Sequence, residues 1–187
     1  MRLGIFGGTF DPPHLGHWLA AMDAVEALGL DHVAWIPAAQ QPLKDGGTAA
    51  DAVHRLAMTR LAVAGEERFS VDPVELERGG ISYMVDTLKG YRQRNAGAAL
   101  FLLLGADAAA LLPKWREPET IRALAEIIVL TRAGEEQALP AGTTALATRR
   151  VDISATEVRA RVKAGRSIRG FVPDAVAAYI AAHGLYQ

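Results

Sequence analysis

The chain has 187 residues, of which 50% are hydrophobic and 22% are charged, which excludes a disordered chain and predicts one globular domain, 1–187. A formal net charge of −1 argues against a protein that coats nucleic acid or an anionic membrane. The lack of cysteine excludes disulfides, cysteine zinc sites and thiol nucleophiles. With no signal-peptide pattern at the start and no apolar run long enough to span a bilayer, we expect a cytoplasmic protein.

Short apolar segments alternate with longer helical patterns along the first half of the chain. Strands are predicted at residues 3–6, 32–36 and 69–71. Helices are predicted at residues 15–28, 51–64 and 82–94. Gly29 is predicted to stop the first helix, and Ser82 to cap the last one. Residues 38–50 contain proline and glycine and are predicted to form a loop.

The second half continues the same alternation. The run 99–104 is apolar at every position, which predicts a strand buried on both faces of a parallel sheet. Further strands are predicted at residues 127–131 and 143–151, and helices at residues 106–112, 155–164 and 173–182. This order predicts an α/β fold, a single Rossmann-like doubly wound parallel sheet with helices on both faces. Because ligands bind beyond the carboxyl ends of such strands, candidate positions are Gly7, Gly105 and Val151.

The segment 7–17, Gly-Gly-Thr-Phe-Asp-Pro-Pro-His-Leu-Gly-His, joins the first predicted strand to the first predicted helix. Gly7 and Gly8 let backbone N–H groups approach an anion, and the helix directs its positive end to the same place. His14 and His17 lie one turn apart on one helix face, and Gly16 between them leaves room for a ligand. Together these features suit a bound polyphosphate.

Other interpretations of this segment have less support. Two histidines at this spacing are, taken alone, more often surface or packing residues. A zinc site would need more ligands, but cysteine is absent and the other histidines do not stand at ligand spacing. The glycine patterns of dinucleotide-binding and P-loop proteins are also absent, which argues against a dehydrogenase or a P-loop ATPase.

A second candidate segment, Ile-Ser-Ala-Thr-Glu-Val-Arg, stands at 153–159. Ser154 and Glu157 have the spacing of a capping box. A helix start with Ser154, Thr156 and Arg159 can also hold phosphate. For this segment alone, an ordinary capped helix is the simpler interpretation.

Together, the two segments resemble the H-x-G-H and I-S-S-T-x-x-R signatures of the nucleotidylyltransferase superfamily, and the first resembles nicotinate mononucleotide adenylyltransferases in particular. Ala155 replaces the second serine of the pattern, which removes a hydroxyl group but keeps the backbone N–H. The resemblance implies that His14 and His17 contact ATP phosphates and stabilise the group in transfer. The ATP-binding residues it implies are Gly7, Gly8, Thr9, Phe10, His14, His17, Gly105, Asp107, Ile153, Ser154, Thr156 and Arg159.

Three further segments resemble the family's acceptor site. Residues 82–88 resemble S-Y-T-x-D-T-L with Met84 in place of threonine, residues 105–115 resemble G-x-D…L…W, and residues 37–44 resemble a loop with a phosphate-binding lysine. The ordinary alternatives are an exposed lysine, a helix cap and aromatic packing, although the polar neighbours of Trp115 favour partial exposure. Arg132 follows another predicted strand and is a candidate for phosphate. The implied substrate-binding residues are Lys44, Tyr83, Thr87, Trp115 and Arg132.

The resemblance implies adenylyl transfer from ATP to nicotinate mononucleotide, giving deamido-NAD and pyrophosphate without a protein nucleophile. Mg²⁺ is the implied cofactor, held by ATP phosphates and water with no protein ligand. The implied partners are ATP and nicotinate mononucleotide; nucleic acid and membrane are not expected, and a homo-oligomer stays open. The alternatives are transfer to nicotinamide mononucleotide, phosphopantetheine or a cytidylyl acceptor, and a non-catalytic nucleotide sensor.

Overall fold

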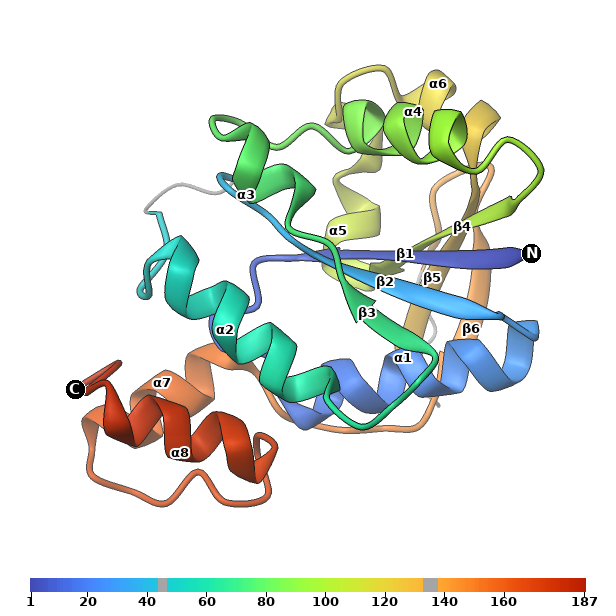
Figure 1. Ribbon diagram of the computed structural model, residues 1–187. Helices are drawn as coiled ribbons and strands as arrows, with labels where there is room; N and C mark the ends of the chain where they lie inside the picture. The colour runs from blue at the N-terminus through green and yellow to red at the C-terminus, as the bar shows by residue number, and fades with distance from the viewer. Residues whose placement is uncertain (44–46, 133–137) are drawn as a thin grey trace.

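The computed structural model describes residues 1–43, 47–132 and 138–187 (Figure 1). In these residues, six parallel strands form one sheet in the order β3-β2-β1-β4-β5-β6. This order turns back between β1 and β4, as in a doubly wound α/β sheet, so the predicted fold class is confirmed. The strands are β1 (Arg2–Gly8), β2 (His32–Pro37), β3 (Phe69–Val71), β4 (Ala99–Gly105), β5 (Glu126–Arg132) and β6 (Thr144–Thr148).

Helices cover both faces of this sheet. Figure 1 shows α4 and α6 on one side, α1 and α2 on the other, and α7 and α8 beyond α2. No helix in the described ranges has the length and apolar character needed to cross a membrane. The helices are α1 (Leu15–Leu28), α2 (Ala52–Val63), α3 (Val74–Arg78), α4 (Met84–Arg94), α5 (Ala106–Ala110), the 3₁₀ helix η1 (Leu112–Lys114), α6 (Pro118–Leu124), α7 (Ala155–Lys163) and α8 (Asp174–Ala182).

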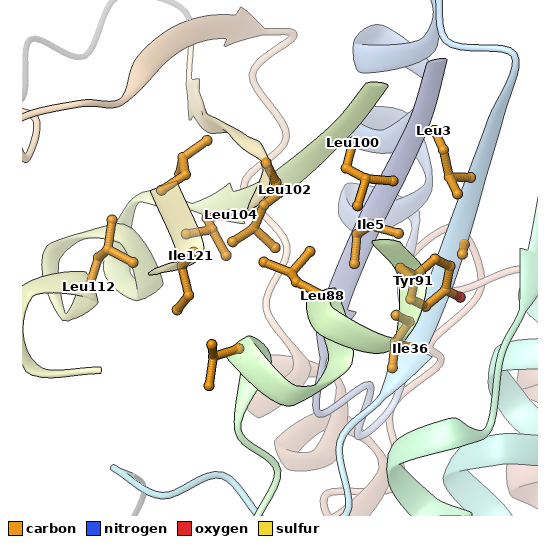
Figure 2. Close-up of a cluster of buried hydrophobic side chains, with 14 of the residues drawn as sticks. Leu3, Ile5, Ile36, Leu88, Tyr91, Leu100, Leu102, Leu104, Leu112 and Ile121 are labelled. Carbon is orange, nitrogen blue, oxygen red and sulfur yellow. The ribbon is translucent and has the colours of Figure 1, made fainter. Parts of the chain in front are cut away.

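The central strands are buried on both faces, as the uninterrupted apolar run predicts. In β4, Leu100, Leu102 and Leu104 belong to the core cluster that includes Leu88 of α4 (Figure 2). Phe101 and Leu103 point to the opposite face and join the cluster beneath α1. Because successive side chains of a strand alternate between faces, only a layer of helices on each side explains this burial. The carboxyl ends of β1 and β4 stay open for a site.

Several short elements differ from the predictions. The helix predicted at 106–112 ends at Ala110, and the chain continues through Pro113 as η1, whose first turn tolerates proline. The helices α3 and α6 were not predicted, because five and seven residues are too few for a clear helical period. The last strand ends at Thr148, so Val151 is not a strand end.

The prediction that Ser82 caps α4 is wrong. Helix α4 begins at Met84, and Tyr83 occupies the N-cap position. The Ser82 hydroxyl instead accepts a hydrogen bond of 2.9 Å from the backbone N–H of Ala39. Ser82 therefore connects the loop after β2 to the segment before α4. The predicted stop at Gly29 is confirmed, with a left-handed backbone at φ 57°.

Candidate functional site

A cavity of about 1410 Å³ opens at the carboxyl ends of β1 and β4, where the strand order reverses. Its volume exceeds the roughly 300–1,000 Å³ of an ordinary small-ligand pocket, which leaves room for two small ligands side by side. Both sequence motifs reach this cavity. All the predicted ATP-binding residues line it, namely Gly7, Gly8, Thr9, Phe10, His14, His17, Gly105, Asp107, Ile153, Ser154, Thr156 and Arg159.

The loop after β1 turns sharply at Phe10, whose φ of 49° is in the left-handed region. The Phe10 ring packs at 5.1 Å from Trp35 and 5.3 Å from His17, measured between ring centroids. A Cβ at Gly8 would lie 2.8 Å from the Phe10 ring, so this turn needs glycine there. The buried ring thus holds the loop backbone in a strained turn beside the cavity, as is typical of ligand-binding loops.

The two histidines form a stacked pair at the start of α1. His14 is the N-cap residue, and its ring centroid lies 3.7 Å from that of His17. The backbone N–H of His14 donates to His17 Nδ1 at 3.2 Å. Because Nδ1 of His17 is an acceptor, its neutral imidazole carries the proton on Nε2. His17 therefore brings one N–H donor to the phosphate-binding end of the cavity.

The absence of a side chain at Gly16 makes room for the His14 ring and not for a ligand. We predicted that it leaves room for a ligand against the helix. A Cβ at this position would instead lie 3.0 Å from His14 Nδ1. The space that glycine leaves is filled by the His14 ring, so any side chain here would displace that ring.

His14 is kept neutral by its surroundings. The residue is 8% exposed, and Nδ1 is buried without a hydrogen-bond partner in the described parts of the chain. Burial, and then the positive charge of Arg132, lower the pKa of His14 from 6.5 to about 4. A neutral imidazole has one N–H donor and one acceptor. The negative charge of an anionic ligand would counter the effect of Arg132 on the pKa of His14.

We expect His14 to make the ligand-free protein less stable in mild acid. The unfolded chain takes up a proton at His14 near pH 6.5, whereas the folded chain resists protonation until about pH 4. The free energy of unfolding therefore carries no penalty from His14 above about pH 6.5, and it decreases as the pH falls from there toward 4. Between pH 7 and pH 5 the loss is about 2 kcal/mol.

Urea unfolding of the wild type and of His14→Asn at both pH values measures this difference. The wild type should lose about 2 kcal/mol more than the variant. An imidazole NMR titration assigns the proton directly. Equal losses in the two proteins, or a midpoint for His14 near 6.5, would contradict the expectation.

The second motif caps α7 and contacts the first motif. The Ser154 hydroxyl accepts the backbone N–H of Glu157 at 3.1 Å, as the predicted cap requires. Arg159 Nη1 donates to the backbone carbonyl of Asp11 at 2.7 Å, and Nη2 donates to the Thr156 hydroxyl at 3.2 Å. Arg159 therefore connects two segments that lie 148 residues apart. The fork of Arg159, which we predicted to bind phosphate, thus contacts protein groups through both terminal nitrogens.

A buried polar cluster supports the loop after β1 from behind. The Asp11 carboxylate accepts the backbone N–H groups of Ala49 at 2.6 Å and Ala50 at 3.1 Å, and the Tyr186 hydroxyl at 2.7 Å. Arg55 of α2 is 1% exposed, and its Nη1 donates to the carbonyls of Thr9 and Ala38, both at 2.8 Å. We call Asp11, Arg55 and Tyr186 the Asp11 cluster. It joins the loops after β1 and β2 to the C-terminal segment.

Sequence reasoning missed Arg55 and Tyr186. The available signal was an arginine within the apolar pattern of α2, because a buried cation requires several acceptors. Burial lowers the pKa of Arg55, and the charge of Asp11 opposes that shift. Burial, and then its bond to Asp11, raise the pKa of the Tyr186 hydroxyl, so it remains a proton donor to the carboxylate.

The other end of the cavity is lined by the predicted acceptor residues Tyr83 and Trp115. Both side chains are partly buried, so their rings offer apolar faces while staying reachable. Arg116 also lines the cavity, and its Cζ lies 4.9 Å from the Tyr83 ring centroid. This end therefore combines two aromatic rings with a guanidinium group, which suits a flat, anionic ring.

Thr87 is not among the residues that line the cavity. It is 2% exposed, and its hydroxyl donates to Glu75 Oε1 at 2.6 Å. Glu75, which sequence reasoning missed, does line the cavity. Burial raises the pKa of Glu75, and the hydroxyl groups of Thr87 and Ser82 oppose the shift. Lys44, the remaining acceptor prediction in that region, lies outside the described residues.

Arg132 stands at the end of β5 and lines the cavity beside the histidine pair. Its Nη1 lies 3.5 Å from Asp152 Oδ1, and Asp152 also pairs with Arg150 at 2.9 Å. These pairs are exposed, so they restrain Arg132 only weakly. Arg132 therefore brings positive charge close to His14, as its effect on the pKa of His14 also indicates.

The sequence also matches known proteins along its length. The matching family model is described as cytidylyltransferase-like and covers residues 5–161. A protein of Gemmatimonas aurantiaca named probable nicotinate-nucleotide adenylyltransferase is 53% identical over 197 residues, covering 100% of this chain and 93% of the relative. A protein of the same name from Thermus thermophilus is 46% identical over 190 residues, covering 100% of both chains.

Solved structures support the fold. The nicotinic acid mononucleotide adenylyltransferase of Plasmodium falciparum, complexed with NaAD, has a TM-score of 0.80 at 17% identity, covering 99% of this chain and 97% of that chain. The crystal structure of a protein from Vibrio parahaemolyticus, described as a putative nicotinate-nucleotide adenylyltransferase, has a TM-score of 0.73 at 18% identity, covering 100% of this chain and 96% of that chain. At these identities the likeness concerns the arrangement of the sheet and helices.

Proposed function

Because this chain belongs to the cytidylyltransferase-like family of nucleotidyltransferases, we propose that it transfers the adenylyl group of ATP to nicotinate mononucleotide. The products are deamido-NAD and pyrophosphate, so the reaction is a step of NAD synthesis. Relatives that match over nearly their full length are named for this activity. The observation that carries the proposal is the cavity that both phosphate-binding segments line, with an aromatic end beyond them.

In this reaction a phosphate oxygen of the acceptor attacks the α-phosphorus of ATP. The bond between the α-phosphorus and the oxygen that bridges to the β-phosphate breaks, and its electron pair leaves with pyrophosphate. The attacking oxygen is already anionic, so it needs no general base. Catalysis then depends on positioning the two nucleotides and on stabilising the negative charge that develops.

The residues around the histidine pair fit this task. His17 carries its proton on Nε2, and we assign this N–H to the phosphate oxygens that gain charge in the transition state. The start of α1 and the charge of Arg132 add positive potential at the same end of the cavity. Tyr83 and Trp115 line the end where the pyridine ring of the acceptor would stack.

We further propose that ATP binds as its Mg²⁺ complex. In the described parts of the chain, no three histidine, cysteine or carboxylate side chains gather to hold a metal. Mg²⁺ prefers oxygen ligands, so phosphate oxygens and water would hold it, while His17 and Arg132 would bind the phosphates. When bound, the ion neutralises phosphate charge.

We propose that residues 1–187 work as one domain in the cytoplasm. The support for one domain is that Arg159 and Tyr186 both bond to Asp11 in the first motif. The support for the cytoplasm is the small-nucleotide chemistry and the lack of cysteine.

A pyrophosphate-release assay with ATP and Mg²⁺ tests the proposed function. Nicotinate mononucleotide, nicotinamide mononucleotide and phosphopantetheine are offered separately, and the products are identified by mass. We expect deamido-NAD, with nicotinate mononucleotide clearly preferred. Turnover of another acceptor alone would refute the acceptor but keep adenylyl transfer. ATP binding without turnover of any acceptor would favour a nucleotide sensor.

A further inference from the structure

Basic side chains of the described cavity wall gather at its two ends. Arg132 and Arg159 belong to the phosphate-binding end, where they accompany the histidine pair and Asp11. Lys114 and Arg116 flank Trp115 at the aromatic end. Lys114 and Arg116 therefore bring positive charge next to the predicted ring-binding residues Tyr83 and Trp115.

Arg116 lies over an aromatic ring of the cavity wall. Its Cζ lies 4.9 Å from the centroid of Tyr83, which also lines the cavity. Nη1 lies 3.5 Å from Asp86 Oδ2, and Nε lies 3.7 Å from Glu117 Oε1. The contact with the Tyr83 ring and the two exposed ion pairs restrain the guanidinium group only weakly, and neither ion pair uses Nη2.

Nicotinate and nicotinamide differ at the pyridine substituent, which is an anionic carboxylate in one and a neutral carboxamide in the other. A planar guanidinium binds a carboxylate through two parallel N–H donors, whereas the NH₂ group of a carboxamide would oppose one of these donors. A cationic side chain at the ring-binding end can therefore favour the acid and disfavour the amide.

We propose that Arg116 recognises the nicotinate carboxylate and sets the preference for the acid acceptor. This inference rests on the proposed function, since it concerns the acceptor end of the same cavity. The ring of the acceptor lies between Tyr83 and Trp115, and its carboxylate faces the guanidinium group. Both ion pairs of Arg116 are exposed to solvent and therefore weak, so they leave its positive charge available to a bound carboxylate.

The test compares kcat/KM for nicotinate and nicotinamide mononucleotide in the wild type, Arg116→Gln and Arg116→Lys. We expect Arg116→Gln to lower kcat/KM for the acid by about 10- to 100-fold, mainly through KM, and to change the amide value far less. Arg116→Lys keeps the charge but loses the planar fork, so its acid-to-amide ratio should lie between the other two. Lys89→Gln is the matched control, because Lys89 pairs with Glu117 at 2.8 Å but does not line the cavity.

Three outcomes would overturn the inference: an unchanged acid-to-amide ratio in Arg116→Gln, an equal loss for both acceptors, or the same change of ratio in Lys89→Gln. Urea unfolding of each ligand-free variant shows whether the fold is retained. Failure of the proposed function is seen separately, in a wild type that uses the amide alone or neither acceptor.

Discussion

Replacing His17 by alanine is expected to lower kcat by about 10²- to 10³-fold, the cost of one lost donor to developing charge. The KM for ATP should rise much less, because the Nε2 donor of His17 is assigned to charge that appears only in the transition state. Steady-state kinetics with saturating nicotinate mononucleotide and varied ATP separate the two parameters. An unchanged kcat would contradict the role, and so would a loss confined to KM.

Two further variants distinguish the lost donor from the lost ring. His17→Gln keeps an amide N–H at a similar reach, so it should recover part of kcat. His54→Ala removes an imidazole that bonds to Tyr179 at 3.0 Å outside the cavity lining, and its kcat should stay near that of the wild type. Because the His17 ring also packs on Phe10 and His14, the stability of each variant must be measured alongside.

The second large effect is expected at Arg55, where methionine should lower the free energy of unfolding by roughly 3–5 kcal/mol. Methionine fills much of the same space but leaves the carbonyls of Thr9 and Ala38 without their donor. It also removes the positive charge that faces buried Asp11. Urea unfolding at pH 7 measures the change.

Arg60→Met is the matched control, because Arg60 lies on the same helix with an exposed side chain. Its effect should stay within about 0.5 kcal/mol. Arg55→Lys keeps a charge but cannot reach several acceptors with one fork, so it should recover only part of the stability. A loss below about 1 kcal/mol in Arg55→Met would mean that water replaces the guanidinium group.

The sheet was predictable because its signals are local. A short apolar run without alternation is typical of a strand buried on both faces, and 99–104 is such a run. The position of the cavity then followed from the general rule that ligands bind beyond the carboxyl ends of the strands in such sheets. The first motif placed His14 and His17 correctly at the helix start, since one helical turn brings residues three apart together.

The remaining features depend on contacts between distant segments. Ser82 has the residue type and position of a helix cap, yet its hydroxyl bonds to Ala39. Thr87 was predicted from a motif to contact substrate, but the motif does not show that the Thr87 hydroxyl donates a hydrogen bond to Glu75. No local sequence pattern predicts the Asp11 cluster either, because its members are separated by 44 to 175 residues.

The large sequence separation between Asp11 and Tyr186 also matters for how the protein folds during its synthesis. Its third hydrogen-bond partner, the Tyr186 hydroxyl, is translated 175 residues after it. A nascent chain that has exposed β1 and α1 to solvent has the glycines and histidines of the first motif, but neither Arg159 nor Tyr186 to brace the loop. Ribosome-bound intermediates should therefore capture ATP poorly, and nucleotide binding should begin only when the last helix has left the exit tunnel.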